Sequence, residues 1–122
     1  MPWEIETWQN EKLIYLKASG SMSLDSIKQM CSETIAEANK QGLTKYLVDF
    51  RDMVPDIEII NIYSLPEILE ELGDNRLSKT AMVFSQDSKE KEKFSFFQTV
   101  SFNRGFNVRL FTKIDEARKW LC

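Results

Sequence analysis

Histidine is absent from this 122-residue sequence, and cysteine occurs only as Cys31 and Cys122. Without histidine there is no Ser-His-Asp or Cys-His nucleophile and no histidine-ligated zinc site. Two cysteines do not make a disulfide framework or a four-cysteine zinc site, so we expect a protein of the reducing cytoplasm. Acid–base chemistry would fall to Asp, Glu, Lys or Tyr, and a carboxylate site for magnesium or calcium stays open. With no recognisable catalytic set, we predict a protein that is not an enzyme and uses no cofactor.

Basic clusters and long apolar runs are also missing. Lysine and arginine number 16 against 19 aspartates and glutamates, a net charge of −3. That balance lacks the positive footprint of a nucleic-acid-binding protein. The longest apolar runs are a few residues, too short for a transmembrane helix, and the N-terminus has no apolar signal core. We therefore expect neither nucleic-acid binding nor membrane insertion.

The composition that is present belongs to an ordinary globular protein, with 43% apolar and 29% charged residues. The length is sufficient for one domain, predicted over 1–122. Residues 3–8 alternate, with Trp3 and Ile5 on one side and Trp8 on the other, which is typical of a half-exposed strand. The turn QNE and a second strand over 12–19 complete a hairpin.

Helical spacing follows the hairpin. An apolar stripe between Leu24 and Ala38 predicts a helix that Ser23 caps and Gly42 ends. Cys31 falls inside this stripe, and we interpret it as a small core residue rather than a reactive thiol.

The remaining elements alternate between strand and helix. Strands are predicted over 45–50, 78–85 and 107–111, and helices over 56–73, 89–104 and 114–121. Pro66 should kink its helix or start a new one at a capping box from Ser64, and Thr112 with Asp115 should cap the last helix. The order ββαβαβαβα predicts an α/β fold with a five-stranded, mostly parallel mixed sheet.

Three segments carry a resemblance to a known family. They are Leu47-Val48-Asp49-Phe50-Arg51-Asp52, then KTAMVF, then a final F-x₄-E-A-x₂-W-L over 111–121. In this order they resemble the STAS-like family, named for sulfate transporter and anti-sigma factor antagonist domains. The resemblance implies a small stand-alone bacterial member whose helices pack mainly on one face of the sheet.

The resemblance also bears on phosphorylation. In anti-sigma factor antagonists a kinase phosphorylates the serine of an Asp-Ser pair at the start of the helix after this strand. Here Asp56 takes the place of the aspartate and Ile57 that of the serine, and no Ser or Thr lies between Thr44 and Ser64. The usual serine switch is therefore predicted to be absent.

Four residues form a candidate interaction loop: Asp49, Arg51, Asp52 and Asp56. Asp49 and Arg51 share a strand face at roughly 7 Å between Cα atoms, so they could form an ion pair. Asp49 could instead bond the backbone of the next loop or act as a catalytic carboxylate. Asp56 could cap a helix or imitate a phosphorylated serine with a permanent charge.

The aromatic residues suggest an interface. Phe94, Phe96, Phe97, Phe102 and Phe106 cannot all point the same way. Either their helix is covered on two sides, or one of them, with Phe96 as candidate, marks an interface or a lipophilic pocket. Trp8 is expected to be exposed and to take part in a homodimer, whereas Trp120 is expected to dock the last helix as a core residue.

We therefore predict a non-enzymatic cytoplasmic binding or regulatory module that works through contact with a protein partner. The alternative is a carrier or sensor of a small lipophilic ligand, because the CRAL-TRIO lipid-transfer domains resemble this fold.

Overall fold

The computed structural model describes residues 2–75 and 77–122. Within them the elements follow the predicted order: β1 (Trp3–Trp8), β2 (Leu13–Met22), α1 (Leu24–Gln41), β3 (Lys45–Pro55), α2 (Ile59–Glu71), β4 (Lys79–Val83), α3 (Lys91–Asn103), β5 (Asn107–Phe111) and α4 (Ile114–Leu121). The predicted α/β class is confirmed.

The strands form one mixed sheet in the order β1-β2-β3-β4-β5. β1 pairs with β2 antiparallel, with Trp3 opposite Ala18 and Trp8 opposite Leu13. All other pairs are parallel, so their connections must cross over the sheet, and each crossover contains a helix. The sheet order leaves β1 and β5 at the two edges.

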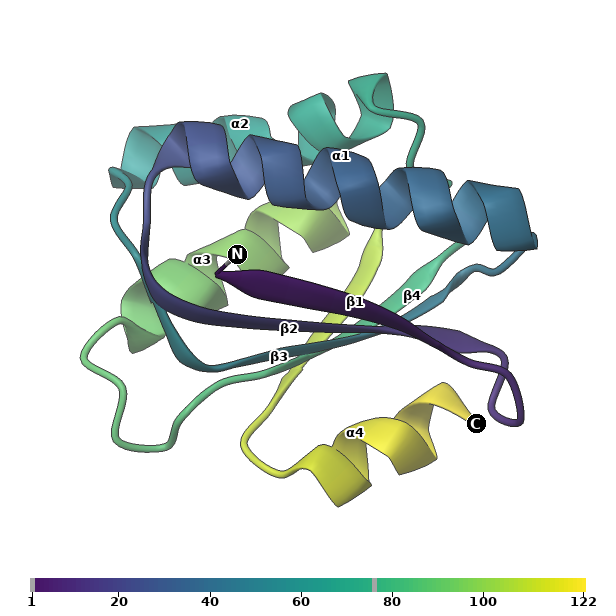
Figure 1. The fold of residues 1–122 in the computed structure, drawn as a ribbon. Coiled ribbons are helices and arrows are strands. Elements are labelled where there is room, and N and C mark those ends of the chain that lie inside the picture. The colour runs from purple at the N-terminus through teal and green to yellow at the C-terminus, as the bar shows by residue number, and fades with distance from the viewer. Residues whose placement is uncertain (1, 76) are drawn as a thin grey trace.

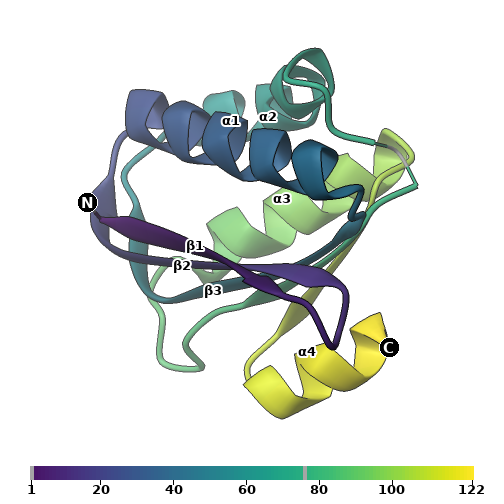
Figure 2. The same ribbon diagram turned by 45° about the vertical axis from the view of Figure 1, so that its right-hand side comes forward.

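The helices lie in two unequal layers. α1, α2 and α3 cover one face of the sheet, and α4 alone packs on the other (Figures 1 and 2). The prediction that the helices pack mainly on one face is thus confirmed. We call these the three-helix face and the α4 face.

Side-chain alternation along β3 divides the core between the two faces. Val48 and Phe50 belong to the main core on the three-helix face, together with Trp3 of β1. Leu47 belongs to a second, smaller cluster on the α4 face. The other buried members of that cluster are Leu13, Ala81, Val83, Ala117 and Leu121.

Two of the predicted helix ends are confirmed. Ser23 Oγ accepts a hydrogen bond from the backbone N of Ser26 at 3.3 Å, so it caps α1 as expected. Gly42 ends α1 in the left-handed conformation, at φ 69°.

Three possible helix ends do not form, and two of them, at Asp56 and Ser64, were each one of two alternatives that the sequence left open. Asp56 does not cap α2, because β3 continues to Pro55 and the backbone N of Asp56 donates to the carbonyl of Met22 at 2.9 Å; the N-cap of α2 is Glu58. No new helix starts at Ser64, since α2 runs through the buried Pro66. The capping box at Thr112 is also absent, because α4 begins one residue later than it requires, after Lys113.

Trp120 is only half-buried, contrary to the expectation of a core residue. Its ring lies at the rim of the second cluster, 5.8 Å from the Phe111 ring and beneath Lys79 Nζ at 4.4 Å. Ala117 and Leu121 fill the centre of the contact instead. The last helix therefore docks as predicted, but through its smaller side chains.

Candidate functional site

The only buried carboxylate among the described residues is Asp49, in the middle of β3. Its neighbours Val48 and Phe50 face the main core, so Asp49 points to the α4 face, beside Val83 on β4. Its side chain is only 2% exposed. Since an unpaired buried charge is strongly destabilising, the surrounding residues must satisfy this carboxylate.

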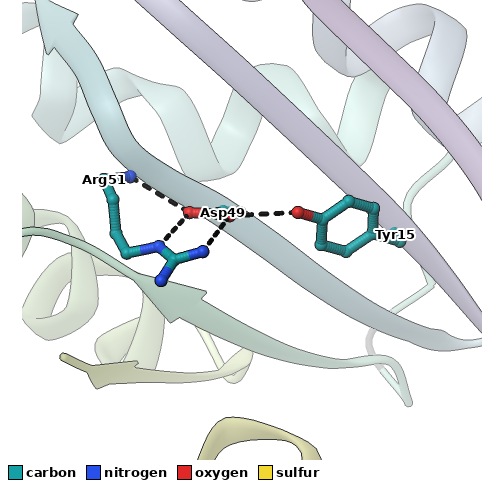
Figure 3. Close-up of polar contacts among 3 residues, drawn as sticks. All are labelled: Tyr15, Asp49 and Arg51. Atoms are coloured by element: carbon teal, nitrogen blue, oxygen red, sulfur yellow. Dashed lines mark hydrogen bonds and ion pairs between the residues drawn. The ribbon is translucent and has the colours of Figure 1, made fainter. Parts of the chain in front are cut away.

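Arg51 and Tyr15 supply four hydrogen bonds to Asp49 (Figure 3). Arg51 Nε and Nη2 donate to Oδ1 and Oδ2 at 2.9 and 2.8 Å. The backbone N of Arg51 donates to Oδ1 at 3.2 Å, and Tyr15 Oη donates to Oδ2 at 3.0 Å. Of the alternatives left open by the sequence, the structure shows the ion pair, together with a backbone bond inside the same strand.

A bulge in β3 makes this geometry possible. Lys17 of β2 pairs with Asp49, but Ser19 pairs with Asp52, so two residues of β3 face one residue of β2. Such an extra residue stays out of the ladder and bends the strand. The backbone N of Arg51 is therefore available to the Asp49 carboxylate. The sequence contains no glycine or proline at this position that would have indicated the bulge.

The ionisation of the three side chains follows from their contacts. Burial acts to raise the pKa of Asp49, but the hydrogen bonds from Arg51 and Tyr15 outweigh it, and the net shift is downward. The hydrogen bond to Asp49 raises the pKa of Arg51. The pKa of Tyr15 is raised to about 12, mainly by burial and then by its hydrogen bond to the Asp49 carboxylate. At neutral pH this is a charged ion pair with a protonated phenol. Because the carboxylate is fully ionised and engaged, the arrangement favours an organising role over a general base.

Trp8 is not the exposed ring that the sequence predicted. It lies opposite Trp3 as expected, on the α4 face, but it stacks on Tyr15 with ring centroids 4.6 Å apart. Arg118 of α4 lies over the ring at 5.5 Å and is held there by two hydrogen bonds to Glu11. Alternation along β1 showed which face Trp8 occupies, but it could not show that a helix from the other end of the chain covers that face.

The segment from β3 to α2 places the other two residues of the candidate interaction loop in solvent. Asp52 and Asp56 are exposed, whereas Asp49 is buried. Exposed with them are Glu58 and several apolar side chains that sequence reasoning did not select: Val54, Ile59, Ile60 and Tyr63. The consecutive pair Ile59-Ile60 was a possible signal, because adjacent helical residues point about 100° apart and both cannot face the core.

The phenylalanines of α3 divide between core and solvent. Phe94 is buried against Phe84 and Phe50, whereas Phe96 and Phe97 are half-buried and pack on the main core. The exposed ring is Phe102, with 75% of its surface accessible. The helix is thus covered on more than one side, and Phe96 is not its exposed aromatic residue.

A cavity of about 120 Å³ lies between the sheet and the three-helix layer. Its wall is almost wholly apolar and includes Leu16, Val48, Ile62, Leu65, Met82 and Phe97. Cys31 also lines it, and burial raises the pKa of this thiol to about 12. Although Cys31 is half-buried rather than fully buried, its thiol has the character of an inert core group.

The described residues contain neither a cluster of metal ligands nor a helix that could span a membrane. No three acidic or cysteine side chains of residues 2–75 and 77–122 lie close enough together to hold a metal ion. Over the same residues, every helix is too short or too polar to cross a membrane.

Several solved structures of low sequence identity share this fold. An uncharacterised protein of Shewanella loihica with a SpoIIAA-like fold superposes with a TM-score of 0.62 at 17% identity, covering 98% of this chain and 92% of that one. The anti-sigma factor antagonist SpoIIAA in its unphosphorylated form gives 0.54 at 16% identity, with 98% and 96% covered. An anti-sigma factor antagonist of Mycobacterium paratuberculosis gives 0.60 at 11% identity, with 98% and 93% covered.

No curated protein matches this sequence at a significant level. A family model does match it, over residues 13–122, which includes every helix and all strands except β1. The segments that carry the resemblance to STAS-like proteins all lie inside this match. The chain therefore belongs to the SpoIIAA-like family.

Proposed function

We propose that this protein is a non-enzymatic cytoplasmic regulatory module that binds another protein through the first turns of α2. The observation that carries the proposal is the group of exposed apolar side chains there. Ile60 and Tyr63 are 70% and 60% exposed and, three residues apart, lie side by side on the helix surface. Ile59 extends the same surface, and we call these three residues the α2 patch.

The energetics favour a protein partner for the α2 patch. Complete burial of one such side chain is worth about 1.5–3 kcal/mol, so covering the patch would stabilise a complex. Asp56 and Glu58 lie within three residues of Ile59 in the chain and are exposed, which gives the patch an acidic rim. A partner with an apolar centre and basic residues around it would be complementary, and its association would weaken as salt increases.

The solved relatives support a role in protein contact. Two of them are named as anti-sigma factor antagonists, and one of these is known in phosphorylated and unphosphorylated forms. In this chain Ile57 stands where the resemblance places the phosphorylated serine, and its side chain is buried in the main core. The proposed module therefore works without that switch, and Asp56 contributes a permanent negative charge to the rim.

The test uses tagged wild-type protein and two matched variants expressed in the source bacterium. Ile60→Asp places a charge in the α2 patch, whereas Leu77→Asp makes the same change at an exposed leucine in the loop beyond α2. Cross-linking and quantitative mass spectrometry should recover one partner with wild type and Leu77→Asp but not with Ile60→Asp. Equal recovery of that partner with both variants would contradict the proposed surface.

A second candidate function is the carriage or sensing of a small lipophilic ligand. The observation that favours it is the apolar cavity of about 120 Å³ beneath α1, α2 and α3. Apolar cavities of similar volume in other proteins stay free of water and take up small apolar molecules. Mass spectrometry of compounds that remain bound through native purification tests this candidate directly.

Self-association stays a prediction, and the sheet order supports it. β1 is an edge strand, and an edge with unpaired backbone groups can pair with a second copy of the chain. A dimer of this kind would lie beside Trp8 and the N-terminal hairpin. Sedimentation of wild type and Trp8→Ala at several concentrations should show a dimer that the substitution weakens, and a monomeric wild type would end the prediction.

A further inference from the structure

The two edges of the sheet differ in how far their backbone groups are already used. On β5, the backbone N of Leu110 donates to Gln98 Oε1 of α3 at 2.8 Å, so a side chain closes part of that edge. The backbone of β1, at the other edge, makes no hydrogen bond to the side chain of any described residue. Unpaired backbone groups on an edge strand are a template for a further strand.

The pairing of β1 with β2 determines which groups are free. The backbone N of Ser19 donates to the carbonyl of Pro2 at 2.9 Å, in register with the ladder between the two strands. In an antiparallel pair, residues that bond to the neighbouring strand alternate with residues that do not. Every second residue from Pro2 onward therefore bonds to β2. The residues between them turn their N–H and C=O groups to the open edge: Trp3, Ile5 and Thr7.

Glutamates flank this open edge on both faces of the sheet. Glu4 and Glu6 are exposed and alternate with core residues of the three-helix face, so they project to the α4 face. Above the three-helix face, α1 runs along β1 (Figures 1 and 2). A pocket lies there between the two elements, lined by Ile5, Thr7, Glu33 and Glu37. We call Glu4, Glu6, Glu33 and Glu37 the edge glutamates.

The edge glutamates keep their negative charge. Trp3 Nε1 and Gln29 Nε2 donate to the two carboxylate oxygens of Glu33, each at 3.1 Å, and both donors are neutral. Lys17 lies opposite Glu4 in the ladder. Even so, none of the four edge glutamates forms an ion pair with a residue that the structure describes. The edge therefore carries an excess of negative charge beside its free backbone groups.

This charge selects among possible occupants of the edge. If two copies paired antiparallel about Ile5, Glu4 of one copy would lie opposite Glu6 of the other, and like charges so placed are destabilising. A strand that carries lysine or arginine would instead place cations beside the carboxylates. The self-association considered above uses the same edge, so the two occupants exclude each other.

We infer that the open edge of β1 binds an extended segment of another protein, rich in lysine and arginine, which adds a strand to the sheet. Main-chain hydrogen bonds to Ile5 and Thr7 would supply affinity, and side chains would supply specificity. Lysines on one side of the added strand would face Glu4 and Glu6, and a basic side chain on its other side would enter the pocket beside Glu33. This surface is separate from the α2 patch.

The probe is the peptide Lys-Val-Lys-Arg-Lys-Val-Lys, whose sequence is the same in both directions. Isothermal titration calorimetry with the 122-residue chain should show saturable binding, weakened roughly tenfold as NaCl increases from about 50 to about 300 mM. Two further peptides carry N-methyl groups, one on the valines and arginine and the other on the lysines. Because only one of these sets of N–H groups can face β1, one methylated peptide should lose binding and the other should keep it.

Two double substitutions locate the binding site. Glu4→Gln with Glu6→Gln should weaken peptide binding about fivefold, because two exposed ion pairs with the peptide are lost. Asp56→Asn with Glu58→Gln makes the same change in net charge at the acidic rim of the α2 patch. This control should leave the affinity for the peptide unchanged.

Thr7→Pro tests the backbone of the edge. Proline lacks the N–H, but that group of Thr7 points to the open edge, so no hydrogen bond to β2 is lost. The substitution should weaken peptide binding about fivefold, the factor that one net hydrogen bond supplies. Thr7→Val keeps the N–H and should bind like wild type.

Three results would overturn the inference, and they differ in what else they affect. If the control at Asp56 and Glu58 loses binding while the variant at Glu4 and Glu6 keeps it, the peptide occupies the α2 patch, and the proposed function survives. If both methylated peptides bind equally, the contact is electrostatic and adds no strand. If no peptide binds saturably while sedimentation shows a dimer that Thr7→Pro weakens, a second copy of the chain is the occupant.

Discussion

Arg51 lies two residues after Asp49 in the same strand, and its side chain donates two hydrogen bonds to the Asp49 carboxylate, at 2.9 and 2.8 Å. Residues so spaced on a regular strand share a face, but their Cα atoms are roughly 7 Å apart. The bulge between them also allows the backbone N of Arg51 to reach the same carboxylate. One buried acid thereby connects β3 to Tyr15 of β2.

We expect Asp49→Asn to destabilise the fold. The substitution leaves Arg51 without its charged partner. It also buries an amide, whose nitrogen cannot accept a hydrogen bond, among the donors of Arg51 and Tyr15. Removing one member of a fully buried ion pair costs about 3–5 kcal/mol, but Arg51 is 44% exposed, which reduces the expected loss to about 1–3 kcal/mol. Urea unfolding measures it, with Asp52→Asn as the exposed control, expected to change the free energy of unfolding by less than about 0.5 kcal/mol. Equal stability of the two variants would mean that the pair is not stabilising.

Acid should weaken the same interaction. The pKa of Asp49 is lowered in the folded state, so its contribution to stability is present above the unfolded value of about 3.9 and is lost as the pH falls through the lower, folded value. The free energy of unfolding of wild type should therefore fall more steeply below about pH 4 than that of Asp49→Asn. Parallel pH profiles for the two proteins would contradict this.

Alkali should act on Tyr15 in the opposite sense. Its pKa is raised to about 12 in the folded protein, so its contribution is present below the unfolded value of about 10 and is lost as the pH rises towards 12. In titrations followed by tyrosinate absorbance, one late-titrating phenol should disappear from the Tyr15→Phe variant. Tyr63→Phe, which changes an exposed tyrosine on α2, is the control and should leave the late titration in place.

Within the last helix, Leu121 should matter more than Trp120. Leu121 is fully buried, and leucine-to-alanine changes at such sites cost about 2–5 kcal/mol. Trp120 lies at the rim under Lys79, so we expect Trp120→Ala to cost about 1–2 kcal/mol, below the 3–5 kcal/mol of a fully buried aromatic residue. Urea titration of both variants gives the order, and a larger loss for Trp120→Ala would mean that the ring is a central part of the contact.

Incubation with an anti-sigma kinase and ATP should leave residues 45–63 without phosphate. This stretch contains no serine or threonine, and the residue at the usual acceptor position, Ile57, is buried. Phosphopeptide mapping by mass spectrometry measures this, with an established antagonist substrate of the same kinase as the positive control. Restoring an acceptor by Ile57→Ser should allow modification only if the change also opens the local packing.

Much of this protein could be predicted from short-range patterns. Alternation placed Trp3 and Trp8 on opposite faces of β1, and helical spacing with Ser23 and Gly42 gave α1 its ends. The succession of elements then allowed few topologies, because parallel strands require crossovers. Asp49 also stands out from the local pattern, because it is a charged residue within an apolar strand.

The features that these patterns did not predict depend on contacts between distant parts of the chain. Arg118 covers Trp8 through an ion pair with Glu11, across 107 positions of sequence. The bulge beside Asp49 arises from the pairing of β3 with β2, and the apolar cavity is lined by residues from three helices and the sheet. Periodicity tells which side of an element is apolar, because it is a property of neighbouring residues. Only packing in three dimensions decides what covers that side, and whether it is covered completely.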